Sequence, residues 1–218
     1  MGKAIVLLSG GIDSSTLLYW AIKRYDVAAL TFDYGSKHGE REQAAAKRIA
    51  GRAGAGHVLI RLPFVNELFR SDLLQSGGEI PEGHYEDLSM KSTVVPFRNG
   101  IMLSIAAGYA ESTGAAKVLY AAHAGDHAIY PDCRPGFLKA MSEAASAGTY
   151  MNVTIEDPFV GLYKKDIILK GRDLQVPFEI TYSCYNGGSL HCGKCGTCLE
   201  RREAFSLAGI PDPTNYAP

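Results

Sequence analysis

Four of the five cysteines lie within one short segment near the end of the chain, at Cys184, Cys192, Cys195 and Cys198. The last three follow a C-x2-C-x2-C spacing, and four thiolates gathered in this way suit a tetrahedral Zn²⁺ ion. Because four thiolates leave no open coordination position, we expect such a site to be structural. An iron–sulfur cluster and a redox-active CxxC pair are alternatives that use the same residues.

The residues around these cysteines predict how the segment folds. Thr197 and Glu200 have the spacing of a capping box, which predicts a helix that runs to about Ala208. Cys198 then lies on the first turn of that helix, where the helix N-terminus favours a thiolate. His191 is a further candidate ligand, but four thiolates complete the site without it, so we do not expect it to bind the metal.

A second candidate site is the segment SGGIDSS, residues 9–15, between an apolar run and a periodic helix pattern. Gly10 and Gly11 let backbone N–H groups approach a ligand, and the helix N-terminus adds a positive end, so the segment predicts an anion site. Three serine hydroxyls are further donors, and Asp13 is placed to cap the helix or to help hold Mg²⁺. A glycine-rich turn with a polar cap is the alternative.

The same segment matches neither the Walker A pattern nor G-x-G-x-x-G. It resembles, at every fixed position, the S-G-G-x-D-S signature of the ATP pyrophosphatase (PP-loop) superfamily. That resemblance implies that the loop holds the β,γ-pyrophosphate of ATP, which is cut between the α and β phosphates to give an adenylated substrate.

Cations should face a loop that stabilises charge developing on pyrophosphate. Arg98 is expected in the first turn of a helix opened by Pro96, where the helix dipole disfavours a positive charge unless an anion lies nearby. Lys164, in the segment GLYKKD, is a second candidate that rests mainly on the resemblance. The alternative for each residue is an ordinary solvated charge.

The segment IYPDCRPGF, residues 129–137, is a third candidate site. Tyr130 and Arg134 each precede a proline, which favours extended backbone. In an extended segment Tyr130, Asp132 and Arg134 point to one face, and together they offer an aromatic ring, a carboxylate and a guanidinium to a purine-like ligand. The alternative is a rigid surface turn with a buried Cys133 and a structural Asp–Arg pair.

Short apolar runs alternate with helix patterns, which predicts an α/β fold with a Rossmann-like parallel sheet flanked by helices and ligands beyond the carboxyl ends of the strands. Phe97, Ile101, Ile105 and Tyr109 predict the apolar stripe of the central helix. Residues 66–91 are aperiodic and read as a long insertion, with a mobile lid as one interpretation. Strands are predicted at residues 4–8, 27–32, 57–62 and 117–122, and helices at 14–24, 40–53, 96–113, 135–147 and within 157–171.

The 218 residues carry 22 Lys and Arg against 23 Asp and Glu, a net charge of −1. This balance counts against a sequence-independent grip on nucleic acid or on an anionic membrane surface. Apolar runs are too short for a signal peptide or a membrane span, and clustered thiols suit a reducing compartment, so we expect a soluble cytoplasmic protein. We expect one domain over residues 1–180 with a small four-cysteine zinc module, residues 181–218, packed on it.

Three motifs stand in order along the chain: SGGIDS, YPDCR and SCY…HCGKCGTC. Together they resemble the 7-cyano-7-deazaguanine synthase (QueC) family, as do TFDYGSKH, VVPFRNGIMLSIAAGYAE and DPTNY, over nearly the whole chain. The resemblance implies a PP-loop, HUP-like fold and an ATP-dependent carbon–nitrogen ligase. Such an enzyme converts 7-carboxy-7-deazaguanine and ammonia to a nitrile, on the route to queuosine and archaeosine. It further implies Mg²⁺ with ATP, a Zn²⁺ site of four cysteines and a homodimer.

The resemblance also implies roles for individual residues. Asp13, Arg98 and Lys164 would be catalytic. Tyr130, Asp132 and Arg134 would bind the substrate, and Cys184, Cys192, Cys195 and Cys198 would hold Zn²⁺. The implied ATP-binding residues are Leu8, Ser9, Gly10, Gly11, Ile12, Asp13, Ser14, Ser15, Thr31 and Phe32.

The sequence departs from the family pattern at one position, because the usual P-G-R-N reads Pro96-Phe97-Arg98-Asn99 here. A QueC-like enzyme diverted to the amide product, or to conjugating the deazaguanine with another acceptor, is therefore an alternative. A tRNA-thiolating PP-loop enzyme is a weaker one, because it needs free catalytic cysteines and a basic surface. A zinc-ribbon nucleic-acid binder leaves SGGIDS unexplained.

Overall fold

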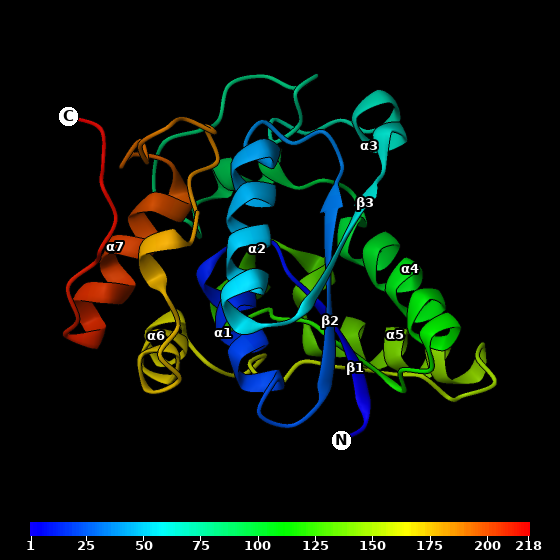
Figure 1. Ribbon diagram of the computed structural model, residues 1–218. Helices are drawn as coiled ribbons and strands as arrows, with labels where there is room; N and C mark the ends of the chain where they lie inside the picture. Colours follow the sequence, from blue (N-terminus) through cyan, green and yellow to red (C-terminus); the bar gives the residue numbers. More distant parts are fainter.

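Five parallel strands form the central sheet of the computed structural model, which describes residues 1–218 (Figure 1). The strand order is β3-β2-β1-β4-β5. The chain leaves β1 toward one edge of the sheet and later returns to the other side of β1, so the order reverses between β1 and β4. In sheets of this kind ligands bind at such a reversal, beyond the carboxyl ends of the strands. The bounds are β1 (Lys3–Leu7), β2 (Asp26–Asp33), β3 (Gly56–Arg61), β4 (Lys117–Leu119) and β5 (Thr154–Glu156).

Seven α-helices surround this sheet. Right-handed crossovers between parallel strands place helices on opposite faces when the direction of winding changes. Accordingly α1, α2 and α6 pack beside one another, while α4 and α5 pack together elsewhere on the sheet (Figure 1). The bounds are α1 (Ile12–Ala21), α2 (Gly39–Ala53), α3 (Pro63–Leu68), α4 (Arg98–Thr113), α5 (Pro135–Ala147), α6 (Lys164–Asp173) and α7 (Gly196–Ala208).

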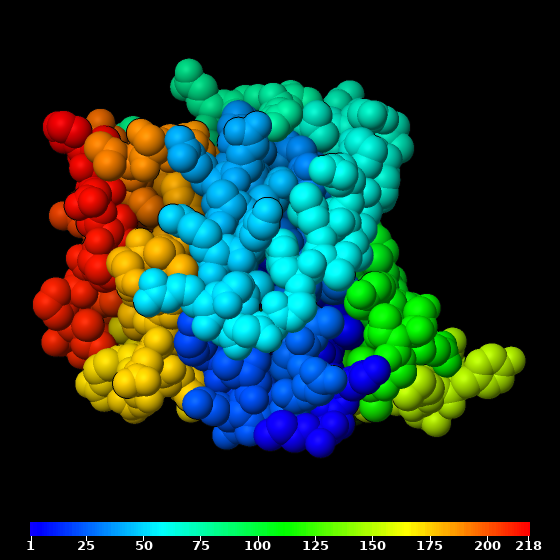
Figure 2. Space-filling model, viewed as in Figure 1, coloured from blue at the N-terminus to red at the C-terminus, as the bar shows by residue number.

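The C-terminal segment shares the apolar core of the sheet domain. Cys184, Cys198 and Phe205 belong to the same buried cluster as the strands, and Phe178 meets Phe205 edge-to-face at 5.4 Å. Arg201, only 1% exposed, donates to the Phe178 carbonyl at 3.2 Å. In Figure 2 the segment forms a layer, orange and red, against the gold residues of α6. The division at residue 180 stays a prediction.

The fold class predicted from the sequence is confirmed, and the predicted strands and helices recur within a few residues of their expected ends. Two short elements, α3 and β5, were not predicted, because three to six residues carry too little periodicity. None of the helices combines the length and the apolar composition that crossing a membrane requires.

The predicted apolar stripe of α4 is displaced. The helix buries Met102, Leu103 and the alanines that follow, whereas Ile101 and Ile105 are half-buried and Phe97 is 58% exposed. The buried face of α4 thus begins with Met102 and Leu103 and continues with small alanines. The i+4 pattern therefore marked the edge of the buried face.

Residues 66–91 are anchored to the domain rather than detached from it. Leu73, Leu74 and Met90 are fully buried. The Lys37 ammonium donates to the carbonyls of Asp72 at 2.6 Å and of Gly77 and Gly78 in the same segment. This part of the chain is thus a packed wall of the molecule, and it delivers Tyr85 to the cavity described next.

Candidate active site

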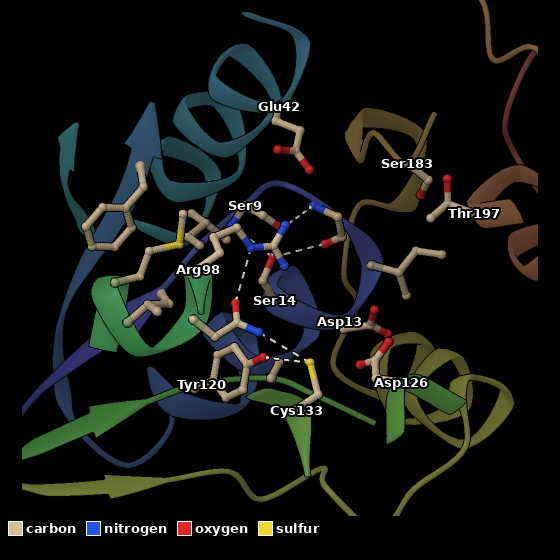
Figure 3. Close-up of a pocket in the computed structure, with 18 of the residues that line it drawn as sticks. Ser9, Asp13, Ser14, Glu42, Arg98, Tyr120, Asp126, Cys133, Ser183 and Thr197 are labelled. Carbon is tan, nitrogen blue, oxygen red and sulfur yellow. Dashed lines mark hydrogen bonds between the residues drawn. The ribbon is translucent and has the colours of Figure 1, made fainter. Parts of the chain in front are cut away.

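A cavity lies at the carboxyl ends of the strands, where the strand order reverses (Figure 3). Figure 3 shows Ser9, Ser14 and Arg98 around it, with Ser183 and Thr197 on the side of the C-terminal segment. The loop after β1, the ends of β2 and β4, the first turns of α4 and α6, and residues 182–197 all contribute to its walls. Distant parts of the sequence therefore meet at one site.

The loop between β1 and α1 has the geometry of an anion site. Gly10 has φ of +90°, and a Cβ there would lie 2.7 Å from the Glu42 carbonyl of α2, so only glycine fits. Gly11 is the N-cap of α1, and no side chain caps the helix. The first N–H groups of α1 therefore remain available to an anionic ligand.

Serine hydroxyls fix the shape of this loop. The Ser14 hydroxyl accepts a hydrogen bond from the Ser9 backbone N–H at 3.2 Å and lies 3.0 Å from the Ser9 hydroxyl. The Ser15 hydroxyl donates to the Gly11 carbonyl at 2.6 Å. From the C-terminal segment, the Tyr182 N–H donates to the Gly10 carbonyl at 2.9 Å. The loop is thus held in place from both ends of the chain.

Lys164 faces this loop from the first turn of α6. Its Nζ lies 3.4 Å from Asp13 Oδ2 and 2.5 Å from Glu200 Oε2, and its side chain is 13% exposed. Burial alone would lower the pKa of Lys164, but the two carboxylates outweigh it and hold that pKa above its ordinary value. The ammonium is therefore a permanent charge beside the loop. Asp13 Oδ1 is buried and accepts no hydrogen bond, so Asp13 does not cap α1.

Behind Lys164 a buried polar network continues. His123 Nε2 lies 3.3 Å from Glu200 Oε1 and 3.4 Å from Asp126 Oδ1. Its Nδ1 accepts the Gly125 N–H at 3.1 Å, so Nε2 carries the proton in the neutral ring. The Tyr85 hydroxyl donates to Asp126 Oδ1 at 2.8 Å.

Arg98 is the second cation of the cavity. It is the first residue of α4, and it donates to the Tyr34 hydroxyl at 3.2 Å while its guanidinium carbon stands 5.6 Å from the Tyr34 ring. No carboxylate lies within 4 Å of it, unlike Lys164. A half-buried guanidinium at a helix N-terminus without an acidic partner is well placed to bind an anion.

Aromatic rings form the other wall. Tyr85 and Tyr130 lie with ring centroids 5.6 Å apart, and the Tyr130 hydroxyl is 3.4 Å from that of Tyr185. His38 lies 5.3 Å from the Tyr185 ring. Such a wall suits a flat heterocycle, which stacks on any exposed ring face.

The predicted grouping of Tyr130, Asp132 and Arg134 is wrong. Residues Pro131–Cys133 form a 3-10 turn rather than an extended segment. Tyr130 lines the cavity, but Asp132 accepts the Asn99 N–H at the start of α4 at 2.9 Å, and exposed Arg134 donates to the His127 carbonyl. Tyr130 and Arg134 do keep the extended backbone that a following proline favours. The 3-10 turn between them, which begins at Pro131, breaks the alternation that would have put all three side chains on one face.

The four cysteines of the C-terminal segment do come together. Their Sγ atoms all lie within 4.8 Å of one another. The N–H of Cys192 donates to Cys184 Sγ at 3.3 Å, and the N–H of Cys195 donates to Cys192 Sγ at 3.3 Å. Backbone N–H donors around clustered sulfurs stabilise thiolates, which is what a tetrahedral metal site needs. His191 is outside the cluster, because its Nε2 accepts the Ser183 N–H at 3.0 Å.

The predicted capping box at the start of α7 is absent. The helix begins at Gly196 with Cys195 as its N-cap and no side-chain cap. Glu200 points instead toward Lys164 and His123. A glutamate three residues after a threonine fits a capping box, but it fits a buried ion pair equally well. Sequence spacing does not distinguish the two roles, because the packing of α7 against α6 decides between them.

Most of the residues expected around ATP do line the cavity. The exceptions are Gly10 and Ser15, which do not line the cavity but fix the shape of the loop. Sequence reasoning assigned no ligand contact to His38, Tyr85, Asp126, Ser183 and Thr197, which also line the cavity. His38, Ser183 and Thr197 lie within the family motifs TFDYGSKH and SCY…HCGKCGTC, so those motifs were the signal that could have found them. Those confirmed as lining residues are Leu8, Ser9, Gly11, Ile12, Asp13, Ser14, Thr31 and Phe32.

Solved structures with the same architecture support the fold. The NMN synthetase of Francisella tularensis aligns with a TM-score of 0.54 at 17% identity, over 96% of this chain and 78% of that one. A predicted subunit of tRNA methyltransferase from Methanocaldococcus jannaschii aligns with a TM-score of 0.52 at 18% identity, over 100% and 93%. At such identities the likeness concerns the fold.

Sequence comparison goes further. A 7-cyano-7-deazaguanine synthase of Porphyromonas gingivalis is 54% identical over 98% of this chain and 96% of its own length. One of Desulfotalea psychrophila is 51% identical over 99% of both chains. The family model described as queuosine biosynthesis protein QueC matches residues 3–209. The chain therefore belongs to the QueC family.

Proposed function

We propose that this protein is an ATP-dependent ligase that converts 7-carboxy-7-deazaguanine and ammonia to 7-cyano-7-deazaguanine. One observation carries the proposal: a single cavity joins an uncapped, glycine-rich helix N-terminus and two cations to a wall of tyrosine rings. The first half suits a triphosphate and the second half suits a flat heterocycle. The names of the relatives support the same reaction.

The first half-reaction activates the carboxylate. A carboxylate oxygen attacks the α-phosphorus of ATP, and the bond to pyrophosphate breaks. The N–H groups of the loop, Lys164 and Arg98 stabilise the charge that grows on the leaving group. Ammonia then attacks the carbonyl carbon and loses a proton, and AMP departs with the former carboxylate oxygen to leave the amide.

The second half-reaction uses the same groups. The amide oxygen attacks a second ATP, pyrophosphate leaves, and loss of the two amide protons with AMP forms the C≡N bond. Each half-reaction removes one oxygen from carbon as AMP, so one adenylating site serves both. Tyr130 stacks against the heterocycle in this proposal. Asp132 acts indirectly through Asn99, and Arg134, which does not line the cavity, makes no direct contact with the substrate in this proposal.

Two metal ions fit the residues present. Asp13 Oδ1, buried without a partner, is the atom that would accept Mg²⁺, which offsets phosphate charge when bound with ATP. Cys184, Cys192, Cys195 and Cys198 would hold Zn²⁺, which stabilises the fold of the C-terminal segment.

We further propose that the protein acts in the cytoplasm on small molecules, without binding nucleic acid directly, and that it forms a homodimer. The near-neutral charge supports the absence of direct nucleic-acid binding. The family resemblance supports the homodimer. Sedimentation equilibrium tests the dimer.

The proposal is tested by incubating the protein with ATP, Mg²⁺, ammonium and 7-carboxy-7-deazaguanine, and identifying the product by mass spectrometry. We expect the nitrile, with AMP and pyrophosphate released only when the deazaguanine is present. Accumulation of the amide, or of a conjugate, would identify a diverted member of the family. No substrate-dependent AMP would contradict the ligase itself.

A further inference from the structure

We propose that Glu200 is the positioning residue through which the cysteine-bearing segment fixes the Lys164 ammonium at the ATP site. The inference rests on the proposed function, because it concerns how that reaction's cation is held. Glu200 does not line the cavity, whereas Lys164 does. Its direct contact with a residue that lines the cavity is the one with Lys164.

The contact joins two elements that the sequence places far apart. Glu200 is the fifth residue of α7, in the same helix as Cys198, and Lys164 is the first residue of α6. Their Oε2 and Nζ atoms lie 2.5 Å apart, and both side chains are almost buried, at 14% and 13% exposure. The cluster of four cysteines anchors the start of α7, so the carboxylate projects from a fixed base.

Glu200 is itself held at its second oxygen. His123 Nε2 lies 3.3 Å from Oε1, and His123 is only 2% exposed. The His123 ring is oriented by the Gly125 N–H, which donates to Nδ1. With one oxygen on His123 and the other on Lys164, the carboxylate has little freedom to rotate, and its position is set by the fold.

Lys164 needs such a partner because a lysine side chain has four rotatable bonds and loses rotamer entropy when it is fixed. Its other acidic contact, Asp13 at 3.4 Å, belongs to the loop that binds ATP. Outside that loop the ammonium faces the Tyr85 ring, whose centroid lies 5.5 Å from Nζ, and Glu200 is its one acidic partner there. Displacing a catalytic group by about 1 Å slows a reaction by a factor of about 100. The contact of Glu200 with Lys164 therefore governs the rate.

The test compares Glu200→Gln with Glu203→Gln, a matched control that removes the same charge from an exposed position of the same helix. Substrate-dependent AMP formation is measured with the melting temperature of each variant. We expect Glu200→Gln to lower kcat about 10- to 100-fold. The KM for ATP should stay within about twofold, because the interaction is realised mainly in the transition state. The control should match the unmodified protein.

A second comparison separates positioning from a purely structural role. In a Lys164→Ala background, Glu200→Gln should cause no further loss of kcat, because the residue through which it acts is gone. Glu200→Asp keeps the charge but shortens the reach, so it should also lose activity.

Unchanged kcat in Glu200→Gln, full activity in Glu200→Asp, or a multiplicative loss in the double variant would each overturn the inference. If the unmodified protein forms no AMP from the deazaguanine, the proposed function has failed instead. The two failures are therefore distinguishable within one set of assays.

Discussion

The Lys164 Nζ and the Asp13 Oδ2 lie 3.4 Å apart, which joins the start of α6 to the glycine-rich loop after β1. The contact places the Lys164 ammonium next to the uncapped N-terminus of α1. Because both features favour the same anion, the site suits pyrophosphate by backbone and side chain together. In the proposed reaction the chemistry thus lies at the loop, and the cysteine segment supports it from behind.

Replacing Lys164 should remove much of this stabilisation. We expect Lys164→Ala to lower kcat for AMP formation by a factor of about 100 to 1,000, the usual cost of losing one preorganised group at a developing charge. Steady-state AMP release measures it. Lys165→Ala is the matched control, because Lys165 is the exposed neighbour of equal charge. Equal activities of the two variants would contradict the role of Lys164.

The four-cysteine cluster should govern metal content. We expect Cys198→Ser to abolish stoichiometric zinc and to lower the melting temperature, because a buried thiolate ligand is lost. Elemental analysis of the purified protein gives the metal content. Cys133→Ser, which changes the one cysteine outside the cluster, should retain the metal. Zinc retained at full occupancy in Cys198→Ser would exclude the cluster as the site.

Phe97 occupies a backbone conformation that suits the glycine usual in its family. Its φ of 54° and ψ of 25° are left-handed, a conformation that costs a non-glycine residue about 1–2 kcal/mol. Its ring is 58% exposed and meets Phe137 edge-on at 5.7 Å.

Two substitutions at Phe97 isolate the backbone cost, because Phe97→Gly and Phe97→Ala both remove the ring but only glycine frees φ. We expect the glycine variant to be more stable than the alanine variant by about 1–2 kcal/mol, measured by chemical denaturation. Equal midpoints would show that the backbone there is unstrained.

Asp157 should make stability depend on pH. Burial raises the pKa of Asp157 to about 7, although N–H groups of Ala122 and Phe159 oppose the shift. In the unfolded chain the same carboxyl loses its proton at about pH 3.9. The folded state therefore binds this proton more tightly than the unfolded chain does. The resulting contribution to the free energy of unfolding is fully present below about pH 4 and is lost as the pH rises to about 7.

We test this with Asp157→Asn, which has no proton to release. The free energy of unfolding of the unmodified protein, relative to the variant, should fall between about pH 4 and pH 7. Asp26→Asn, at an exposed carboxylate, is the control and should follow the unmodified protein. A difference between unmodified and Asp157→Asn proteins that is constant with pH would contradict the raised pKa.

Most of the fold and half of the site followed from the sequence, because both rest on local patterns. The apolar runs and helix periods predicted a parallel sheet, and SGGIDSS predicted the loop at its edge. The cysteine spacing predicted a cluster that the structure forms. Arg98 and Lys164 were expected to face the loop, and both line the cavity.

The remaining parts depend on packing between distant segments. Glu200 matched a capping box equally well, and only the contact of α7 with α6 assigns it to Lys164. Tyr85 lies in an aperiodic segment, so nothing local connects it with a ligand. Arg134 failed because the 3-10 turn at Pro131 rotates it away from Tyr130.

The most direct test of the central claim follows the oxygen atoms of the substrate. 7-Carboxy-7-deazaguanine labelled with ¹⁸O at both carboxylate oxygens is converted with unlabelled ATP, and AMP, pyrophosphate and product are analysed by mass spectrometry. Adenylation at each half-reaction predicts two AMP molecules per nitrile, each with one ¹⁸O, and unlabelled pyrophosphate. Label released as inorganic phosphate or water, or nitrile formed with a single AMP, would contradict the account.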